Sequence, residues 1–75
     1  MTSNETFPDM TSMQKRAKSI LHEGIPVLRS YGDNGDGRDR FVGYTAFMRV
    51  QGVEHTIHLK LAEGAPLEGD PRAIY

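Results

Sequence analysis

The stretch Arg40-Phe-Val-Gly-Tyr-Thr-Ala-Phe-Met-Arg-Val50, followed by Gln51-Gly52 and Val53-Glu-His-Thr-Ile-His-Leu-Lys-Leu61, decides the fold. Its two arms are rich in β-branched and aromatic residues and are separated by two residues, which is the pattern of a β-hairpin. With Gln51 and Gly52 as the turn, most apolar side chains fall on one face, because side chains alternate along a strand. The pairs expected on this face are Val50–Val53, Met48–His55, Ala46–Ile57, Tyr44–Leu59 and Val42–Leu61.

The opposite face of the hairpin mixes charged groups, hydroxyl groups and two phenyl rings. The turn leaves a second register open, because Gln is not the Asn or Asp that a type I′ turn prefers at its first position. A three-residue loop with Gly52 in the left-handed conformation would shift the pairing by one residue and bury Phe41 and Phe47. We favour the two-residue turn because it separates the two faces more cleanly. The mixed face then carries Phe41, Gly43, Thr45, Phe47, Arg49, Glu54, Thr56, His58 and Lys60.

A helix and another strand are expected before the hairpin. Thr11-Ser-Met-Gln14 matches the capping box, in which a hydroxyl residue begins a helix and Gln follows three residues later. Apolar residues then recur at helical spacing, which predicts a helix over about residues 12–23. Gly24 and Pro26 end it. The segment Ile25–Tyr31 predicts a strand; because Pro26 cannot donate to a ladder, it is either an edge strand or begins only at Val27.

We therefore predict an α+β fold in which one N-terminal helix packs on a three-stranded antiparallel meander, in the order α-β-β-β. Residues 11–61 form this single domain. Residues 1–10 are polar apart from one phenylalanine and are broken by Pro8, so we expect a flexible N-terminus. Residues 62–75 contain Gly64, Pro66, Gly69 and Pro71, and we expect an extended or mobile C-terminal tail.

The composition limits the classes of function. Nine Lys and Arg stand against ten Asp and Glu, and this net charge of −1 gives no general attraction to nucleic acid or anionic membranes. The chain has no cysteine for a disulfide or a thiolate metal site. It has no secretory signal pattern, and no apolar stretch approaches the ~20 residues of a membrane-spanning helix. We expect a cytoplasmic protein with no membrane partner.

Motifs for metal binding and catalysis are weak. The loop Gly32–Asp39 is rich in Asp and Gly, as calcium loops are, but aligning Gly37 as the EF-hand glycine puts glycines where both essential carboxylates are needed. His55 and His58 lie three apart on a strand and point to opposite faces, so one metal ion cannot bind both. No nucleophile elbow or phosphate-binding loop is present. We expect no catalytic residue, no metal, no cofactor and no enzymatic activity.

The mixed hairpin face is the candidate binding surface. An apolar patch with a polar rim is typical of a protein partner or a second copy of the chain. RNA-binding sheets also stack bases on such rings, but Phe41 and Phe47 lie about 20 Å apart along a strand. A third interpretation is that the tail covers these rings with Leu67, Ile74 and Tyr75.

These observations predict a small non-enzymatic protein-binding module, such as a regulator or a phage- or plasmid-type inhibitor, that occupies a site on a larger protein or forms a homodimer. It would bind through the mixed face, or by adding an exposed edge such as the first strand to a partner's sheet. The expected contact residues are Phe41, Phe47, Arg49, Thr56, His58 and Lys60. The alternative is a nucleic-acid-binding domain that uses the basic residues Lys15, Arg16, Lys18 and Arg29 with the cations of the sheet face.

Overall fold

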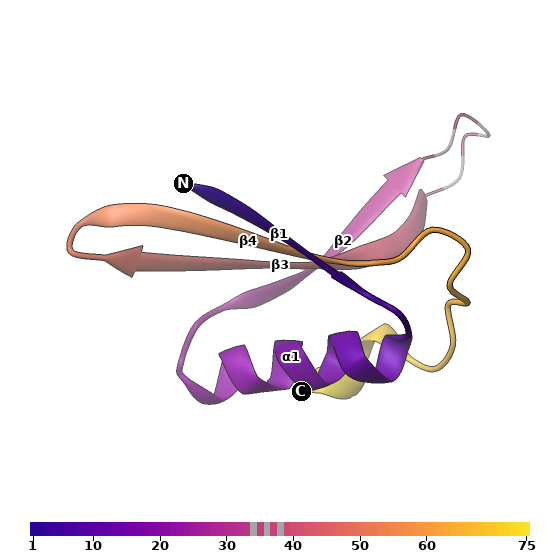
Figure 1. Ribbon diagram of the computed structural model, residues 1–75, viewed down its shortest axis with the longest axis horizontal. Coiled ribbons are helices and arrows are strands. Elements are labelled where there is room, and N and C mark those ends of the chain that lie inside the picture. The colour runs from indigo at the N-terminus through magenta and orange to yellow at the C-terminus, as the bar shows by residue number, and fades with distance from the viewer. Residues whose placement is uncertain (34, 36, 38) are drawn as a thin grey trace.

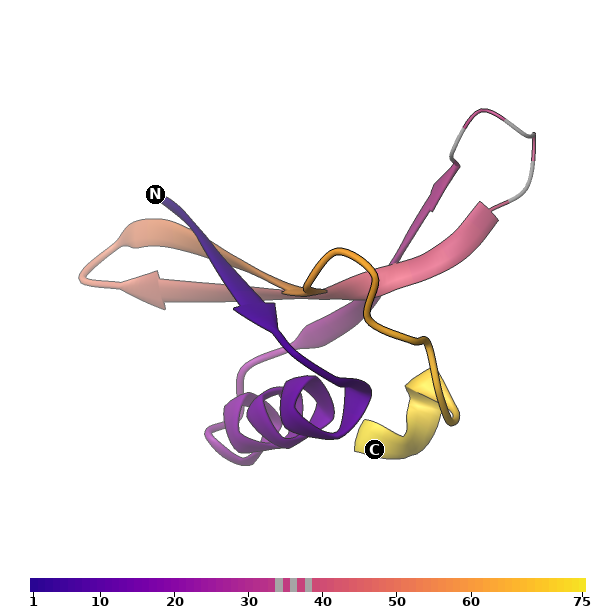
Figure 2. The same ribbon diagram turned by 45° about the vertical axis from the view of Figure 1, so that its right-hand side comes forward.

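The computed structural model describes residues 1–33, 35, 37 and 39–75 and has an α+β fold (Figure 1). A helix, α1, and a short 3-10 helix, η1, lie on the same side of one mixed sheet (Figures 1 and 2). The strands stand in the order β1-β4-β3-β2 across this sheet. The elements are β1 (Thr2–Phe7), α1 (Met10–His22), β2 (Val27–Asp33), β3 (Asp39–Val50), β4 (Val53–Leu61) and η1 (Pro71–Ile74).

The central hairpin has the register predicted from the two-residue turn. β3 and β4 pair from Val50 opposite Val53 down to Gly43 opposite Lys60. Gln51 has a φ of 53° and Gly52 a φ of 79°, so both turn residues are left-handed, as a type I′ turn requires. Tyr44, Ala46 and Leu59 are buried on the side of α1. The predicted separation of the two faces is confirmed over this part of the hairpin.

The predicted three-stranded sheet is wrong, because the sheet has a fourth strand. Thr2–Phe7, which we expected to be a flexible N-terminus, form β1 and run parallel to β4, with Thr2 opposite Thr56 and Phe7 opposite Leu61. The chain then crosses the sheet through α1 to β2 at the other edge, and β2 runs parallel to β1 without pairing with it. The fold is therefore a split β-α-β unit with the β3–β4 hairpin inserted between its two strands.

The helix begins earlier than the capping box predicted. α1 starts at Met10, and the N-cap is Asp9, whose carboxylate accepts a hydrogen bond from the Ser12 backbone N–H at 2.7 Å. This hydrogen bond lowers the pKa of Asp9. Asp is at least as good an N-cap as Thr, and Met10 adds one more buried side chain to the helix face. The other buried residues of α1 are Met13, Ala17 and Ile20.

A β-bulge in β3 changes which residues face the core. Ser30 pairs with Gly43, whereas Tyr31 pairs with Phe41, so Val42 is an extra residue in β3. The bulge turns Phe41 toward α1, where it is 8% exposed, and turns Val42 outward, where it is 45% exposed. Our placement of Phe41 on the mixed face and of Val42 on the apolar face is therefore wrong. The physical reason is that an inserted residue reverses the alternation of side chains.

Only glycine fits at the centre of this bulge. Gly43 has a φ of 155°, and a Cβ atom built on it would overlap the carbonyl oxygen of Leu59 on the neighbouring strand. The reversal also brings the ring of Phe41 against that of Tyr44, with 5.0 Å between the ring centres in an edge-to-face arrangement.

The C-terminal tail returns to the helix side of the sheet. Ile74 in η1 is 5% exposed and belongs to the same apolar core as α1. The buried Tyr44 hydroxyl donates to the Pro71 carbonyl at 2.5 Å, and the Gln14 side chain donates to the Asp70 carbonyl at 2.9 Å. Burial raises the pKa of Tyr44. The tail thus ends in a docked helical turn, and it covers the face of the sheet opposite to that of Phe47.

Candidate functional site

One face of the sheet carries no covering element in the described part of the chain, because α1 and η1 both lie on the other side (Figures 1 and 2). We call it the open face. By the strand registers its side chains include Thr2, Asn4 and Thr6 from β1, Glu54, Thr56, His58 and Lys60 from β4, Val42, Thr45, Phe47 and Arg49 from β3, and Leu28 and Ser30 from β2.

Three large apolar side chains of the open face are exposed to solvent. Phe47 is 38%, Val42 is 45% and Leu28 is 55% exposed. Leu28 lies opposite Thr45, and Phe47 is two residues further along β3, so Leu28 and Phe47 are diagonal cross-strand neighbours. This pair forms an apolar centre toward the hairpin end of the face, and Val42 forms a second one at the bulge.

A row of polar side chains crosses the face between these two apolar centres. The hydroxyl groups of Ser30 and Thr45 are hydrogen-bonded at 2.6 Å, and Thr45 Oγ1 is 3.2 Å from Nδ1 of His58. Asn4 lies opposite His58 on β1. The row therefore spans all four strands. Because Thr45 occupies the Nδ1 position of His58, Nε2 is the ring nitrogen left for solvent or a ligand.

The geometry of the described residues offers no metal centre. No group of three or more His, Cys, Asp or Glu side chains among them is placed to hold a metal ion. His55 and His58 lie on opposite faces of β4, opposite Met48 and Thr45 respectively. Of the calcium-loop candidate, Asn34, Asp36 and Arg38 lie outside the described residues.

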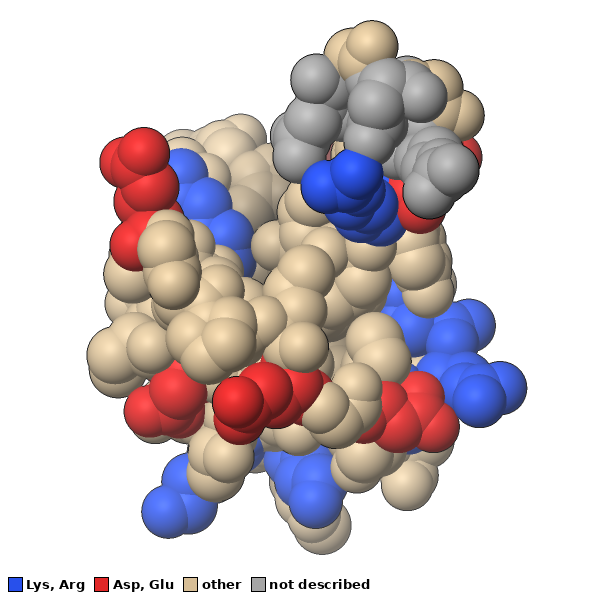
Figure 3. Space-filling model, turned by 90° about the vertical axis from the view of Figure 1, so that its right-hand side faces the viewer, with Lys and Arg blue, Asp and Glu red and all other residues tan. Residues whose placement is uncertain are grey.

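The basic residues of the nucleic-acid alternative do not share one surface. Lys15 and Lys18 are exposed on α1. Arg16 Nε lies 3.1 Å from a carboxylate oxygen of Glu5 on β1, and this hydrogen bond raises the pKa of Arg16. Arg29 lies on β2, at the opposite edge of the sheet from β1. On the side of the molecule shown in Figure 3, basic and acidic side chains are interspersed rather than gathered into patches.

Most of the predicted contact residues lie together on the open face. Phe47, Arg49, Thr56, His58 and Lys60 are all there, and Phe41 is the exception. Sequence reasoning missed the contributions of Leu28, Val42, Ser30 and Asn4. Only one of these had a sequence signal: an isolated glycine inside a strand, Gly43, indicates a bulge, and a bulge would have turned Val42 outward.

No protein-family model, curated protein or solved structure matches this chain, so its function is argued from geometry alone. Among the described residues, no helix is both long enough and apolar enough to cross a membrane.

Proposed function

We propose that this protein is a non-enzymatic binding module that docks on a larger protein through the open face, with Phe47 at the centre of the contact. The observation that supports this most strongly is the one-sided packing of the sheet. α1 and η1 cover one face, while Phe47, Leu28 and Val42 stay exposed on the other. A module that occupies a functional site on its partner would act as a regulator or inhibitor of that partner.

The composition of the open face suits a protein interface. Aromatic residues surrounded by polar groups are frequent energetic centres of interfaces, because the rim excludes water from the buried ring. Phe47 lies opposite Thr56, and the next pair along the hairpin is Arg49 opposite Glu54. His58 and Lys60 continue the rim along β4.

The size of the face suggests where the interface extends. Four strands at ~4.8 Å spacing and about six residues at ~3.3 Å give a patch of roughly 400 Å². A stable interface buries about 800 Å² on each partner. We therefore expect the partner to reach around the tip of the hairpin as well, where Val50 and Val53, whose side chains belong to the opposite face, are 49% and 52% exposed.

The alternative of docking through the edge of β2 has less support. The hydroxyl of Tyr75 donates a hydrogen bond to the Val27 carbonyl at 2.9 Å. The tail therefore occupies the beginning of this edge, where an added strand would pair with the backbone. None of the described residues covers the open face in this way.

A site-specific photocrosslinking experiment tests the proposal. A photoreactive phenylalanine analogue is placed at Phe47, and at the exposed Lys18 on the helix side as the control position. Both proteins are incubated with lysate of the source cells, with and without nuclease treatment, and irradiated. The proposal predicts a discrete protein adduct from position 47 that is absent from position 18, and that unlabelled wild type competes away while Phe47→Ala competes poorly.

Two outcomes of this experiment would contradict the proposal. One is an identical set of adducts from both positions. The other is an adduct from position 47 that forms only in lysate not treated with nuclease and that disappears as salt rises, which is the behaviour of nucleic-acid binding. Because Phe47 is partly exposed, Phe47→Ala should keep the fold, and circular dichroism checks this.

A further inference from the structure

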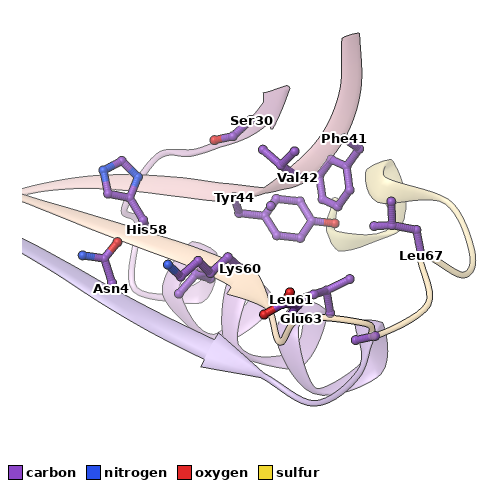
Figure 4. A pocket seen from close by; sticks show the side chains of 13 residues that line it. Asn4, Ser30, Phe41, Val42, Tyr44, His58, Lys60, Leu61, Glu63 and Leu67 are labelled. Atoms are coloured by element: carbon purple, nitrogen blue, oxygen red, sulfur yellow. The ribbon is translucent and has the colours of Figure 1, made fainter. Parts of the chain in front are cut away.

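A hollow of about 590 Å³ lies where the open face meets the chain that follows β4 (Figure 4). The bulge in β3 borders this space, because it turns the Val42 side chain toward the hollow. Its volume falls within the ~300–1,000 Å³ of ordinary small-molecule sites, which are mostly apolar with a few polar groups. The residues that line it include Asn4 from β1, Ser30 from β2, Val42 from β3, His58 and Lys60 from β4, and Leu67 from the tail.

The two ends of the hollow differ in chemistry. Asn4, His58 and Lys60 lie together at one end, whereas Leu61 and Leu67 lie at the other (Figure 4). Val42, Tyr44 and Phe41 border the space between these ends along β3 (Figure 4). The hollow is therefore amphipathic along its length.

The polar end offers donors without partners in the described part of the chain. The Lys60 ammonium has no ion-pair partner there, and the Asn4 side chain makes no hydrogen bond there. His58 uses Nδ1 for Thr45 and keeps Nε2 for another group. An ammonium, an amide and a ring nitrogen close together form a natural site for a carboxylate, since charge-assisted hydrogen bonds are the stronger ones.

Glu63 disfavours an acid group in the part of the hollow next to Leu61. Its side chain lies beside Leu61, away from Asn4 and His58 (Figure 4). Like charges repel, so an acid group placed near Glu63 would be disfavoured. The acid therefore belongs at Lys60, and the apolar part of the ligand belongs against Val42, Leu61 and Leu67.

We propose that this hollow binds a small amphipathic carboxylate, with its acid group at Asn4, His58 and Lys60 and its hydrocarbon part against Val42, Leu61 and Leu67. The site is separate from the apolar centre at Phe47, which does not line the hollow. It shares Val42, His58 and Lys60 with the proposed docking face but not Phe47, and ligand binding does not require the protein partner.

Octanoate and 1-octanol form a matched pair of probes, because they differ in the acid group and share the hydrocarbon chain. Both are titrated into the ¹⁵N-labelled protein while amide chemical shifts are followed by NMR. We expect saturable octanoate-dependent shifts at Asn4, Val42, Lys60 and Leu67. We expect octanol to shift Val42 and Leu67 at higher concentration and to leave Asn4 and Lys60 nearly unchanged.

Variants separate the two parts of the site. Lys60→Glu should weaken octanoate binding about tenfold or more and leave octanol binding unchanged, as expected for loss of a charged hydrogen-bond partner. Lys18→Glu changes the net charge equally, lies on the exposed side of α1, and should change neither. Leu67→Asp should weaken both ligands. These side chains are exposed, and the same spectra verify folding.

Three results would overturn the proposal. They are equal affinities for octanoate and octanol, equal losses from Lys60→Glu and Lys18→Glu, and shifts that are scattered over the chain and do not saturate. Phe47→Ala should keep octanoate binding intact, so failure of this site and failure of the protein-docking proposal are told apart.

Discussion

Replacing Gly43 by alanine should damage the fold more than replacing any other glycine whose surroundings are described. A Cβ atom at Gly43 would overlap the Leu59 carbonyl oxygen, and the φ of 155° is one that residues with a side chain rarely adopt. The backbone conformation costs an alanine about 1–3 kcal/mol. Displacing the Leu59 carbonyl from its place between strands costs about 1–3 kcal/mol more.

The expected loss for Gly43→Ala is thus about 2–6 kcal/mol. At roughly 0.05–0.15 kcal/mol per residue, the whole chain should have only about 4–11 kcal/mol of stability. For a domain of this size, such a loss lowers the thermal midpoint by roughly 8–48 °C. Thermal and urea unfolding followed by circular dichroism measure both quantities.

Gly64→Ala is the matched control for this experiment. Gly64 has a φ of 83°, but nothing lies within 4 Å of a Cβ built on it. The Gly64→Ala variant should lose only about 1 kcal/mol of stability, which is the cost of placing an alanine in the left-handed conformation. If Gly43→Ala loses no more stability than Gly64→Ala, Gly43 does not pack closely against the Leu59 carbonyl. The outward placement of Val42 at the bulge would then lose its basis.

Three further variants test the packing of the helix side. Tyr44→Phe should cost about 1–2 kcal/mol, because it leaves the Pro71 carbonyl unpaired. Burial raises the pKa of Tyr44, so the phenol keeps its proton to a higher pH in the native state than in the unfolded state, and wild-type stability should fall as pH rises above about 10. Urea unfolding midpoints measured against pH should show a smaller fall for the variant than for the wild type. Ile74→Ala should lose about 2–4 kcal/mol if η1 is part of the core, and an unchanged thermal midpoint would contradict this docking. A double-mutant cycle on Glu5 and Arg16 should give a coupling free energy below about 1 kcal/mol, because both side chains are partly exposed. Salt near 1 M should remove this coupling. A larger coupling that resists salt would contradict the expected weak, exposed ion pair.

The central hairpin could be predicted because one register buries apolar residues and the alternative exposes them. The preference for burying these apolar side chains was strong enough to overcome an unfavourable residue, Gln51, at the first turn position. Gln51 adopts a φ of 53° although it is not glycine. The helix was predictable for a similar reason, since Met13, Ala17 and Ile20 recur on one face and are all buried.

β1 could not be predicted because its sequence lacks the apolar alternation of a strand. Thr2, Asn4 and Thr6 face the open side, where polar residues suffice, and Glu5 faces the helix side, where its carboxylate pairs with Arg16. The strand is held by its parallel ladder with β4 and by the connection to α1. Neither the backbone ladder nor the connection requires a particular order of apolar and polar side chains in residues 1–10.

The bulge and the tail account for the remaining errors at the candidate site. Strict alternation placed Phe41 with Phe47, whereas the extra residue at Val42 sends Phe41 into the core. The bulge is a property of the pairing between β2 and β3, and the pattern of the β3–β4 hairpin alone carries no information about that pairing. The tail interpretation is wrong for Phe47, because Tyr44 and Gln14 hold η1 on the helix side, whereas Phe41 does share the buried core with Ile74.

The central claim is that the helix and the tail cover one face of the sheet and leave the other open. NMR spectra of side-chain signals, recorded with and without a water-soluble paramagnetic chelate, measure the exposure of each face directly. The structure predicts strong broadening for Leu28, Val42 and Phe47 and little for Phe41 and Tyr44. If Phe47 and Val42 were protected as well as Tyr44 is, the open face would be covered, and both proposed binding sites would lose their foundation.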